Sequence, residues 1–325
     1  MTQRQLTIVS LFSGIGGFER GLEEAGHHTL QFWELMPEAQ ACLRQHFPLS
    51  KIEADGDITQ PKFPQSLPER FDVLTAGFPC QDLSQAGRMH GLSGSRSGLI
   101  LRVLDVLAAR PEHCRPAWLL LENVAFMRHL DSGSAMRVIL ERLTKLGYDW
   151  AYRQVDSNAF GLPQRRKRIY FAACRPDAGD PRTVLFADDG IRPARVMSPG
   201  WLDGTACGFY WTEGNRGIGW GYDLVPALKV GSSFQMPSPP AILHPREGIV
   251  TPTITDAEAL QGFERGWTSP AEGVNRDRNG RSRWHLIGNA VSVPVSKWLG
   301  YRLSHPIAPL PTLIESATPL WPGAK

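Results

Sequence analysis

Short apolar runs and segments with helical spacing alternate along the first half of the chain. An apolar run bounded by turn residues is typical of a buried strand, whereas a helix shows apolar residues three and four positions apart. The predicted strands lie at 6–12, 29–34, 71–78, 117–124, 150–155 and 168–174, and a weaker one precedes the turn at 55–57. The predicted helices lie at 18–25, 37–46, 99–109 and 134–146. Strands that alternate with helices favour an α/β fold in which helices cover both faces of a parallel sheet.

This alternation ends near residue 174. Residues 175–250 are rich in Gly, Pro, Trp and short polar turns, and they show no long helical pattern. We therefore divide the chain into a first domain at 1–174 and a smaller, irregular domain at 175–282. A segment with helical spacing follows at 283–304, and the proline-rich tail at 305–325 is expected to run extended over the surface.

The composition permits a nucleic-acid partner and argues against several other classes. The net charge is +3 and the pI is about 8.6, a mild positive excess that suits a polyanionic partner. The five cysteines are scattered without a Cys-x-x-Cys pair, so we expect reduced thiols in a cytosolic protein and no metal site. No apolar run reaches about 18 residues, so no membrane span is expected.

Polar and small residues follow several predicted strands at the point where each strand ends. They are Ser13, Gly14, Gly16 and Gly17, then Glu34, Asp57, Pro79 with Cys80, and Glu122 with Asn123. Each has an ordinary structural explanation, such as a tight turn, a surface acid or a buried thiol. Because ligands bind outside the carboxyl ends of strands in open α/β sheets, their joint placement predicts a ligand site.

The chemistry of these residues suits an adenosine-containing cofactor without a pyrophosphate. The glycines do not spell Gly-x-Gly-x-x-Gly, which disfavours a nicotinamide-dependent oxidoreductase. Glu34 is placed to accept hydrogen bonds from a ribose diol, and Asp57 is placed to accept one from an adenine amino group.

Eight motifs in a fixed order then resemble those of bacterial and phage DNA cytosine-C5 methyltransferases of the type II restriction-modification kind. They are SLFSGIGGF (10–18), FWEL (32–35), GDI (56–58), GFPCQDLS (77–84), ENV (122–124), QRRKR (164–168), TPTITDAEALQGF (251–263) and RWHLIGNAVSVPV (283–295). The resemblance implies a Rossmann-like S-adenosylmethionine-dependent methyltransferase fold with a smaller target-recognition domain. One departure is Ser10, where the family commonly has aspartate, and we expect a local change there.

The resemblance implies a reaction that begins at Cys80. Carbon 5 of cytosine is a poor nucleophile, and a thiolate that adds to carbon 6 makes it electron-rich. Glu122 is then the proton donor to N3, while Arg166 or Arg168 favours the thiolate and contacts cytosine O2. On an extended strand, Gln164 would share one face with both arginines.

The resemblance also assigns the cofactor pocket, whose occupant is S-adenosylmethionine with S-adenosylhomocysteine as product. The predicted cofactor-binding residues are Phe12, Ser13, Gly14, Gly16, Gly17, Glu34, Leu35, Asp57, Ile58, Pro79, Leu99, Asn289 and Ala290. The segment 283–304 is expected to return to the first domain and complete this pocket.

Double-stranded DNA is the expected partner of a monomeric enzyme in the bacterial cytosol or nucleoid. The target base must leave the helix, and the Gly/Ser-rich loop at 84–98 is suited to close over it. The predicted DNA-binding residues are Ser84, Arg88, Arg96 and Gln164. An arginine cluster, Arg276, Arg278, Arg281 and Arg283, either follows the DNA backbone or belongs to a solvated loop.

Three other interpretations stay open at this point. The chain could act on tRNA, although its GFPCQDLSQAG segment differs from the usual loop of those relatives. It could be a catalytically inactive DNA-binding homologue, although Cys80, Glu122 and Arg168 are all present. The third is the oxidoreductase disfavoured above.

Overall fold

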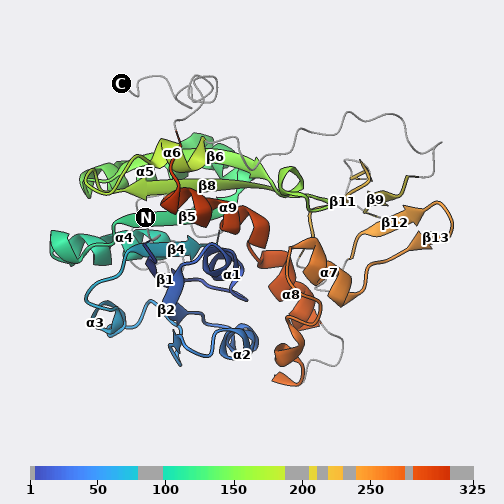
Figure 1. Cartoon of the computed structure of the whole chain (residues 1–325), viewed down its shortest axis with the longest axis horizontal. Helices are drawn as coiled ribbons and strands as arrows, with labels where there is room; N and C mark the ends of the chain where they lie inside the picture. Colours follow the sequence, from blue (N-terminus) through green and yellow to red (C-terminus); the bar gives the residue numbers. More distant parts are fainter. Residues whose placement is uncertain are drawn as a thin grey trace.

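A seven-stranded sheet forms the centre of the molecule, in the order β3-β2-β1-β4-β5-β8-β6 (Figure 1). The computed structural model describes residues 4–79, 98–186, 205–210, 219–229, 239–274 and 281–307. The strands of this sheet are β1 (Thr7–Leu11), β2 (His28–Trp33), β3 (Lys51–Ile52), β4 (Val73–Gly77), β5 (Trp118–Val124), β6 (Asp149–Asp156) and β8 (Lys167–Cys174).

The sheet is mixed, whereas the alternation of strands and helices predicted a parallel one. Strands β3, β2, β1, β4 and β5 are parallel, but β8 runs antiparallel to both β5 and β6. The reason is the connection from β6 to β8, which holds only the short helix η4 (Ser157–Phe160) and the two-residue strand β7 (Gln164–Arg165). A parallel return needs a longer crossover, usually a helix, so this connection reverses the chain.

Helices cover both faces of the sheet, as predicted (Figure 1). The described helices are α1 (Gly17–Glu24), α2 (Pro37–His46), α3 (Phe63–Ser66), α4 (Leu99–Ala109), α5 (Ser134–Lys145), α6 (Pro181–Leu185), α7 (Ile254–Leu260), α8 (Arg281–Asn289) and α9 (Val293–Ser304). Successive residues of β1 serve opposite faces: Val9 packs with α4 and α5, and Ile8 packs with α1, α6 and α9. This alternation follows from the pleat of a strand.

Two helices pack on the large domain although the predicted boundaries separated them from it. Val184 and Leu185 of α6 share a core cluster with α9 and β8, so the packing of the large sheet continues beyond residue 174. Ala257 of α7 lies in a third cluster with Leu43 of α2 and Ile287 of α8. The return to the large domain thus begins near residue 254, before the predicted start at 283.

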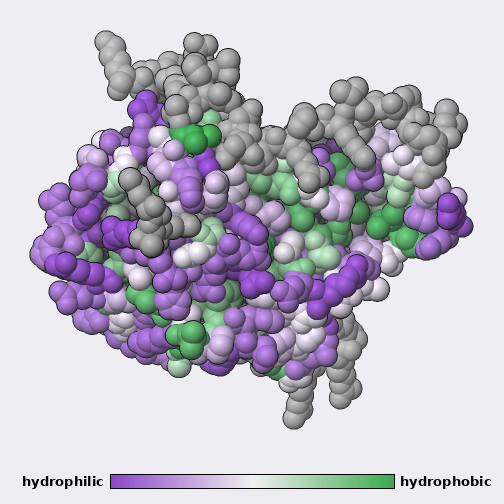
Figure 2. Space-filling view, in the orientation of Figure 1, coloured by the Kyte–Doolittle hydropathy of each residue, from purple (hydrophilic) through white to green (hydrophobic). Residues whose placement is uncertain are grey.

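A small four-stranded sheet, in the order β10-β9-β12-β13, lies beside the large domain (Figure 1). Its strands are β9 (Cys207–Phe209), β10 (Gly221–Tyr222), β12 (Ala241–His244) and β13 (Gly248–Val250). We call residues 205–250 the small region. Another strand of this region, β11 (Val225–Pro226), pairs in parallel with β7 of the large domain. Figure 2 shows apolar side chains beside β12 and β13, where Leu243 and Ile249 are exposed. No helix in the described ranges is long and apolar enough to cross a membrane.

Candidate active site

A cavity of about 720 Å³ lies at the carboxyl ends of β1, β2, β4 and β5, where the strand-end rule placed a ligand site. The turn after α8 closes one of its walls. The predicted site residues that line it are Phe12, Ser13, Gly14, Glu34, Leu35, Asp57, Ile58, Pro79, Leu99, Glu122, Arg166, Arg168, Asn289 and Ala290. Residues that lie up to 278 positions apart in the sequence, from Phe12 to Ala290, therefore meet around one space.

The end of β2 is joined to the loop after β1 through Glu34. One oxygen of its carboxylate accepts a hydrogen bond from the Gly14 N–H at 2.7 Å, and the other accepts one from the Met36 N–H at 2.8 Å. Burial raises the pKa of Glu34 even though these two bonds favour its charged form. The acid is therefore held in one orientation at the cavity wall.

Gly16 and Gly17 are not among the described residues that line the cavity. A Cβ on Gly16, whose φ is +82°, would lie 2.5 Å from the ring of Phe47, and one on Gly17 would lie 2.2 Å from the Val291 carbonyl oxygen. The structure thus gives these two glycines a packing role, because they let the first turn of α1 approach α2 and the 291–293 segment.

The turn after β3 presents Asp57 to the cavity in a fixed conformation. Its carboxylate accepts hydrogen bonds from the backbone N–H and the hydroxyl of Thr59, at 2.8 and 2.7 Å. The hydroxyl bond is the main cause that lowers the pKa of Asp57, so the group is charged at neutral pH. Arg102 of α4 donates to the carbonyl oxygens of Ile58 and Gln60, and this anchor was not predicted from the sequence.

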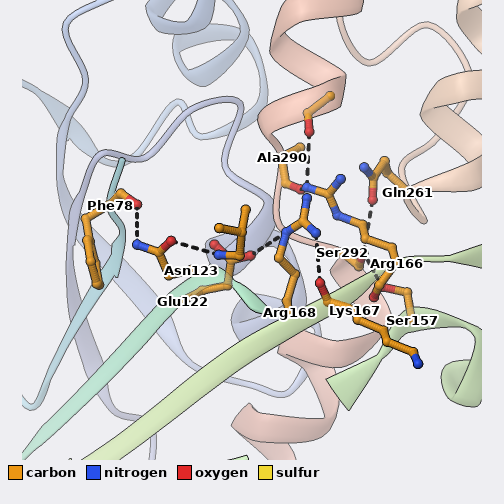
Figure 3. Close-up of polar contacts among 12 residues, drawn as sticks. Phe78, Glu122, Asn123, Ser157, Arg166, Lys167, Arg168, Gln261, Ala290 and Ser292 are labelled. Atoms are coloured by element: carbon orange, nitrogen blue, oxygen red, sulfur yellow. Dashed lines mark hydrogen bonds and ion pairs between the residues drawn. The ribbon is translucent and has the colours of Figure 1, made fainter. Parts of the chain in front are cut away.

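Glu122 and Arg168 form an ion pair on adjacent strands at the cavity (Figure 3). The Nε of Arg168 lies 3.1 Å from a carboxylate oxygen of Glu122. Glu122 is buried, and burial raises its pKa while Arg168 and Arg166 oppose that rise. A raised pKa is the property that a general acid needs, and here burial supplies it against the two neighbouring cations.

Asn123 orients the loop that leads toward the predicted nucleophile. Its amide donates to the Phe78 carbonyl oxygen at 2.9 Å, and its side-chain oxygen accepts from the Val124 N–H at 2.8 Å (Figure 3). Both ends of the amide are engaged inside the protein, so Asn123 supports the site from behind.

Arg166 lies between β7 and β8 and links them to residues 288–290, at the end of α8. Its guanidinium is 1% exposed, and one nitrogen donates to the carbonyl oxygens of Gly288 and Ala290 at 3.1 and 2.8 Å (Figure 3). Burial lowers the pKa of Arg166 to about 9, with a further contribution from Arg168. Between the two carbonyls, Asn289 is exposed at the cavity wall.

Gln164 is buried, and its amide is used within the protein, so the geometry does not support the predicted DNA contact. Its nitrogen donates to the Leu260 carbonyl oxygen at 2.9 Å, and its oxygen accepts from the Leu228 N–H at 3.0 Å. The predicted alternation does hold, since Gln164 and Arg166 are buried while Arg165 and Lys167 are exposed.

Four predicted site residues, Cys80, Ser84, Arg88 and Arg96, lie outside the described residues, and so do Arg276 and Arg278 of the arginine cluster. Arg283 of that cluster lies within α8 and is buried, with ion pairs to Glu258 and Glu272. Its charge is neutralised inside the protein, so Arg283 does not follow a DNA backbone.

A buried acid beneath the loop after β1 was missed from the sequence. Glu19 of α1 is 1% exposed and accepts a hydrogen bond from the Thr75 hydroxyl at 2.6 Å. Ser10, the position that departs from the family pattern, donates its hydroxyl proton to the Ser13 hydroxyl at 2.7 Å. Burial is the main cause that raises the pKa of Glu19 from 4.5 to about 7.

We expect Glu19→Gln to stabilise the protein at pH 8. Because the pKa is higher in the folded state, stability falls as pH rises from about 4.5 to about 7 and then stays level. The amide removes this penalty, which amounts to roughly 3 kcal/mol above pH 7 and vanishes below pH 4.5. Urea unfolding at several pH values measures it, with Glu141→Gln on the exposed face of α5 as the control. A gain that does not vary with pH would contradict the assignment.

Comparison with known proteins places this site in a family. The model for C-5 cytosine-specific DNA methylases matches residues 6–187. The chain is 46% identical over 323 residues to the type II methyltransferase M2.BsuMI of Bacillus subtilis (strain 168). The aligned part makes up 98% of this chain and 81% of that relative. It is 36% identical to the type II methyltransferase M.DsaV of Dactylococcopsis salina, covering 93% of this chain and 87% of the relative. Its fold is similar to the crystal structure of the S. pombe Dnmt2 methyltransferase, with a TM-score of 0.63, 19% identity, and coverage of 91% and 97%.

The fold and the matches define the class of protein as a methyltransferase. The chain belongs to the C-5 cytosine-specific DNA methylase family, as the order of its motifs implied. The oxidoreductase interpretation is thereby excluded.

Proposed function

We propose that this enzyme methylates carbon 5 of a flipped-out cytosine in a specific duplex sequence, as the modification enzyme of a type II restriction-modification system. The proposed methyl donor is S-adenosylmethionine, and the reaction passes through a covalent bond between Cys80 and carbon 6 of the base. One observation carries this proposal: the buried Glu122–Arg168 pair opens onto the same cavity as Glu34 and Asp57. The carboxyl proposed to protonate cytosine and the two carboxylates proposed to bind the nucleoside of the cofactor thus line the same cavity.

The residues at the cavity fit an adenosine bearing a cationic side chain. Glu34 is held by two backbone N–H groups, which leaves lone pairs on both oxygens for a ribose diol. Leu35 and Ile58 offer apolar surface, and Asp57 has a carboxylate for an adenine amino group. When bound, S-adenosylmethionine supplies an electrophilic methyl group on a positively charged sulfur. The two carboxylates favour that charge.

We expect Glu34→Ala and Asp57→Ala each to weaken cofactor binding by about 1–3 kcal/mol, because each removes hydrogen bonds to a charged acceptor. Calorimetric titration measures the change. Asp55→Ala is a matched control, since Asp55 lies in the same turn but pairs with Lys62 outside the cavity. Unchanged affinity in both test variants would mean that the cofactor lies elsewhere.

The protein groups then divide the work on the base. The Cys80 thiolate forms a bond to carbon 6, Glu122 gives a proton to N3, and Arg168 stays beside Glu122 as a cation. Carbon 5 takes the methyl group, and N3 then returns its proton to Glu122. Carbon 5 next loses its hydrogen as a proton to a base, for which water is suitable. The electrons of that C–H bond restore the ring double bond as the C6–sulfur bond breaks and frees Cys80.

Tritium transfer from labelled cofactor tests this function. The expected result is label on mixed-sequence duplex DNA and none on tRNA. A duplex carrying 5-fluorocytosine at the target should form a covalent complex, because fluorine does not leave as a proton does. Label on tRNA alone would overturn the proposed substrate. No label on either would support the interpretation as an inactive DNA-binding homologue.

A further inference from the structure

The small region contacts the strand segment 163–168, which carries both site arginines, at three consecutive residues. The Val225 N–H donates to the Pro163 carbonyl oxygen at 2.8 Å, and the Leu228 N–H donates to the Gln164 side chain at 3.0 Å. The guanidinium of Arg165 donates to the Trp220 carbonyl oxygen at 2.8 Å. The β7–β11 pairing adds a short parallel ladder. The segment directly before Arg166 is thus where this part of the small region is attached.

Gln164 is the buried member of this attachment and also reaches a third part of the chain. Its nitrogen donates to the carbonyl oxygen of Leu260, at the end of α7. The neighbouring Gln261 is buried as well; its amide nitrogen donates to the Ile287 carbonyl oxygen, and its side-chain oxygen accepts from the Ser292 hydroxyl. The Gln164 amide therefore joins the small region to the end of α7, where Gln261 holds the Ile287 carbonyl oxygen. A buried amide matched at both ends is costly to unmake.

The same strand segment carries the two arginines of the site. Arg166 holds the Gly288 and Ala290 carbonyls, and Arg168 holds Glu122. Four residues of extended chain span about 13 Å from Gln164 to Arg168. This segment thus joins the attachment of the small region to the Glu122–Arg168 pair.

We propose that Gln164 is a positioning residue. It fixes the small region to the strand segment 163–168, so that DNA bound by the small region places the Arg168 guanidinium beside the Glu122 carboxyl. This inference rests on the proposed function, because it assumes that the small region binds duplex DNA and that Glu122 serves the reaction. It replaces the predicted direct DNA contact of Gln164 by an internal one.

Gln164→Met tests the proposal, because methionine has a similar length but leaves the Leu228 N–H and the Leu260 carbonyl unpaired. The single-turnover rate at saturating DNA should fall at least about tenfold, while cofactor affinity stays within about twofold. Arg168 opposes the rise in the pKa of Glu122, so a displaced Arg168 should let that pKa rise further. The alkaline limb of the pH–rate profile, where the rate falls as Glu122 loses its proton, should then move to higher pH. A purely structural role would lower thermal stability without moving that limb.

Gln164→Glu is the conservative variant that keeps the test decisive if the methionine variant does not fold. A protonated glutamic acid accepts from Leu228 and donates to Leu260 as glutamine does, so its rate relative to wild type should be near one at low pH. The ratio should fall as the buried carboxyl ionises. Gln154→Met, on an exposed position of β6, is the matched control and should behave as wild type.

The results separate the two proposals. A wild type that puts no label on duplex DNA refutes the proposed function. An active wild type together with a folded Gln164→Met of unchanged rate and pH profile refutes the role of Gln164. If the methionine variant does not fold, a Gln164→Glu rate ratio that is independent of pH refutes it.

Discussion

Cys80→Ala should reduce methyl transfer to duplex DNA by at least about 10⁴-fold, because without a thiolate nothing activates carbon 5 for attack. Cofactor affinity should stay within about twofold of wild type. The described residues around the proposed cofactor come from the loop after β1, the end of β2, the Asp57 turn, and the end of α8 with the turn after it. The defect is therefore expected in the chemical step alone.

Tritium transfer measures the rate, and a duplex with 5-fluorocytosine reports the covalent step directly. Wild type should form a complex that survives denaturation, and Cys80→Ala should form none. Cys114→Ala is the matched control, because that thiol is buried in the short helix η2 (Glu112–Cys114) and does not line the cavity. Substantial turnover by Cys80→Ala would show that another group is the nucleophile.

The sequence alone predicted the large domain well, for a physical reason. A strand covered on both faces is apolar at most positions, so a run such as 117–121 is visible without any partner. Helices α2 and α4 also have the predicted bounds, since Pro37 opens α2 and a Gly/Ser-rich stretch precedes α4. Once the strands are placed, their carboxyl ends share one edge, and fourteen of the described predicted site residues line one cavity.

The sequence could not show which distant residue completes each polar group. Arg168, Arg166 and Arg283 are the same residue type, yet one pairs with Glu122, one with backbone carbonyls and one with Glu258. Gln164 looked available for DNA because neither Leu228 nor Leu260 is near it in sequence. The small region is harder still, because its short strands leave little periodicity to detect.

Glu19 shows how a polar residue on a helix can mislead. It lies in the first turn of α1, where an acid favourably meets the positive end of the helix dipole and needs no other explanation. The structure instead places it over the centre of the sheet, against Thr75 of β4. The departure at Ser10 was the available signal, since it marked a change in the groups that support the cofactor loop.

The second large effect is expected at Glu122. Glu122→Gln should lower the single-turnover rate by about 10²–10⁴-fold, the range by which a positioned general acid contributes. Glutamine has the same shape and can still hydrogen-bond to N3, but it has no proton to give. Affinity for duplex DNA and cofactor should change far less, since the ion pair of this carboxyl within the described ranges is with Arg168, not with the small region or Glu34.

The pH profile distinguishes a lost proton donor from a lost partner for Arg168. In wild type, burial keeps the pKa of Glu122 above its ordinary value, so the reactive protonated form declines as pH rises through that pKa. The alkaline limb should be present in wild type and absent from the residual rate of Glu122→Gln, because the amide does not titrate.

Arg168→Lys is the companion variant: it keeps a cation near the carboxyl, so the limb should persist there with a reduced rate. If Glu122→Gln retains a rate within tenfold of wild type and keeps the limb, the proton at N3 comes from another group, and Glu122 serves only to hold Arg168.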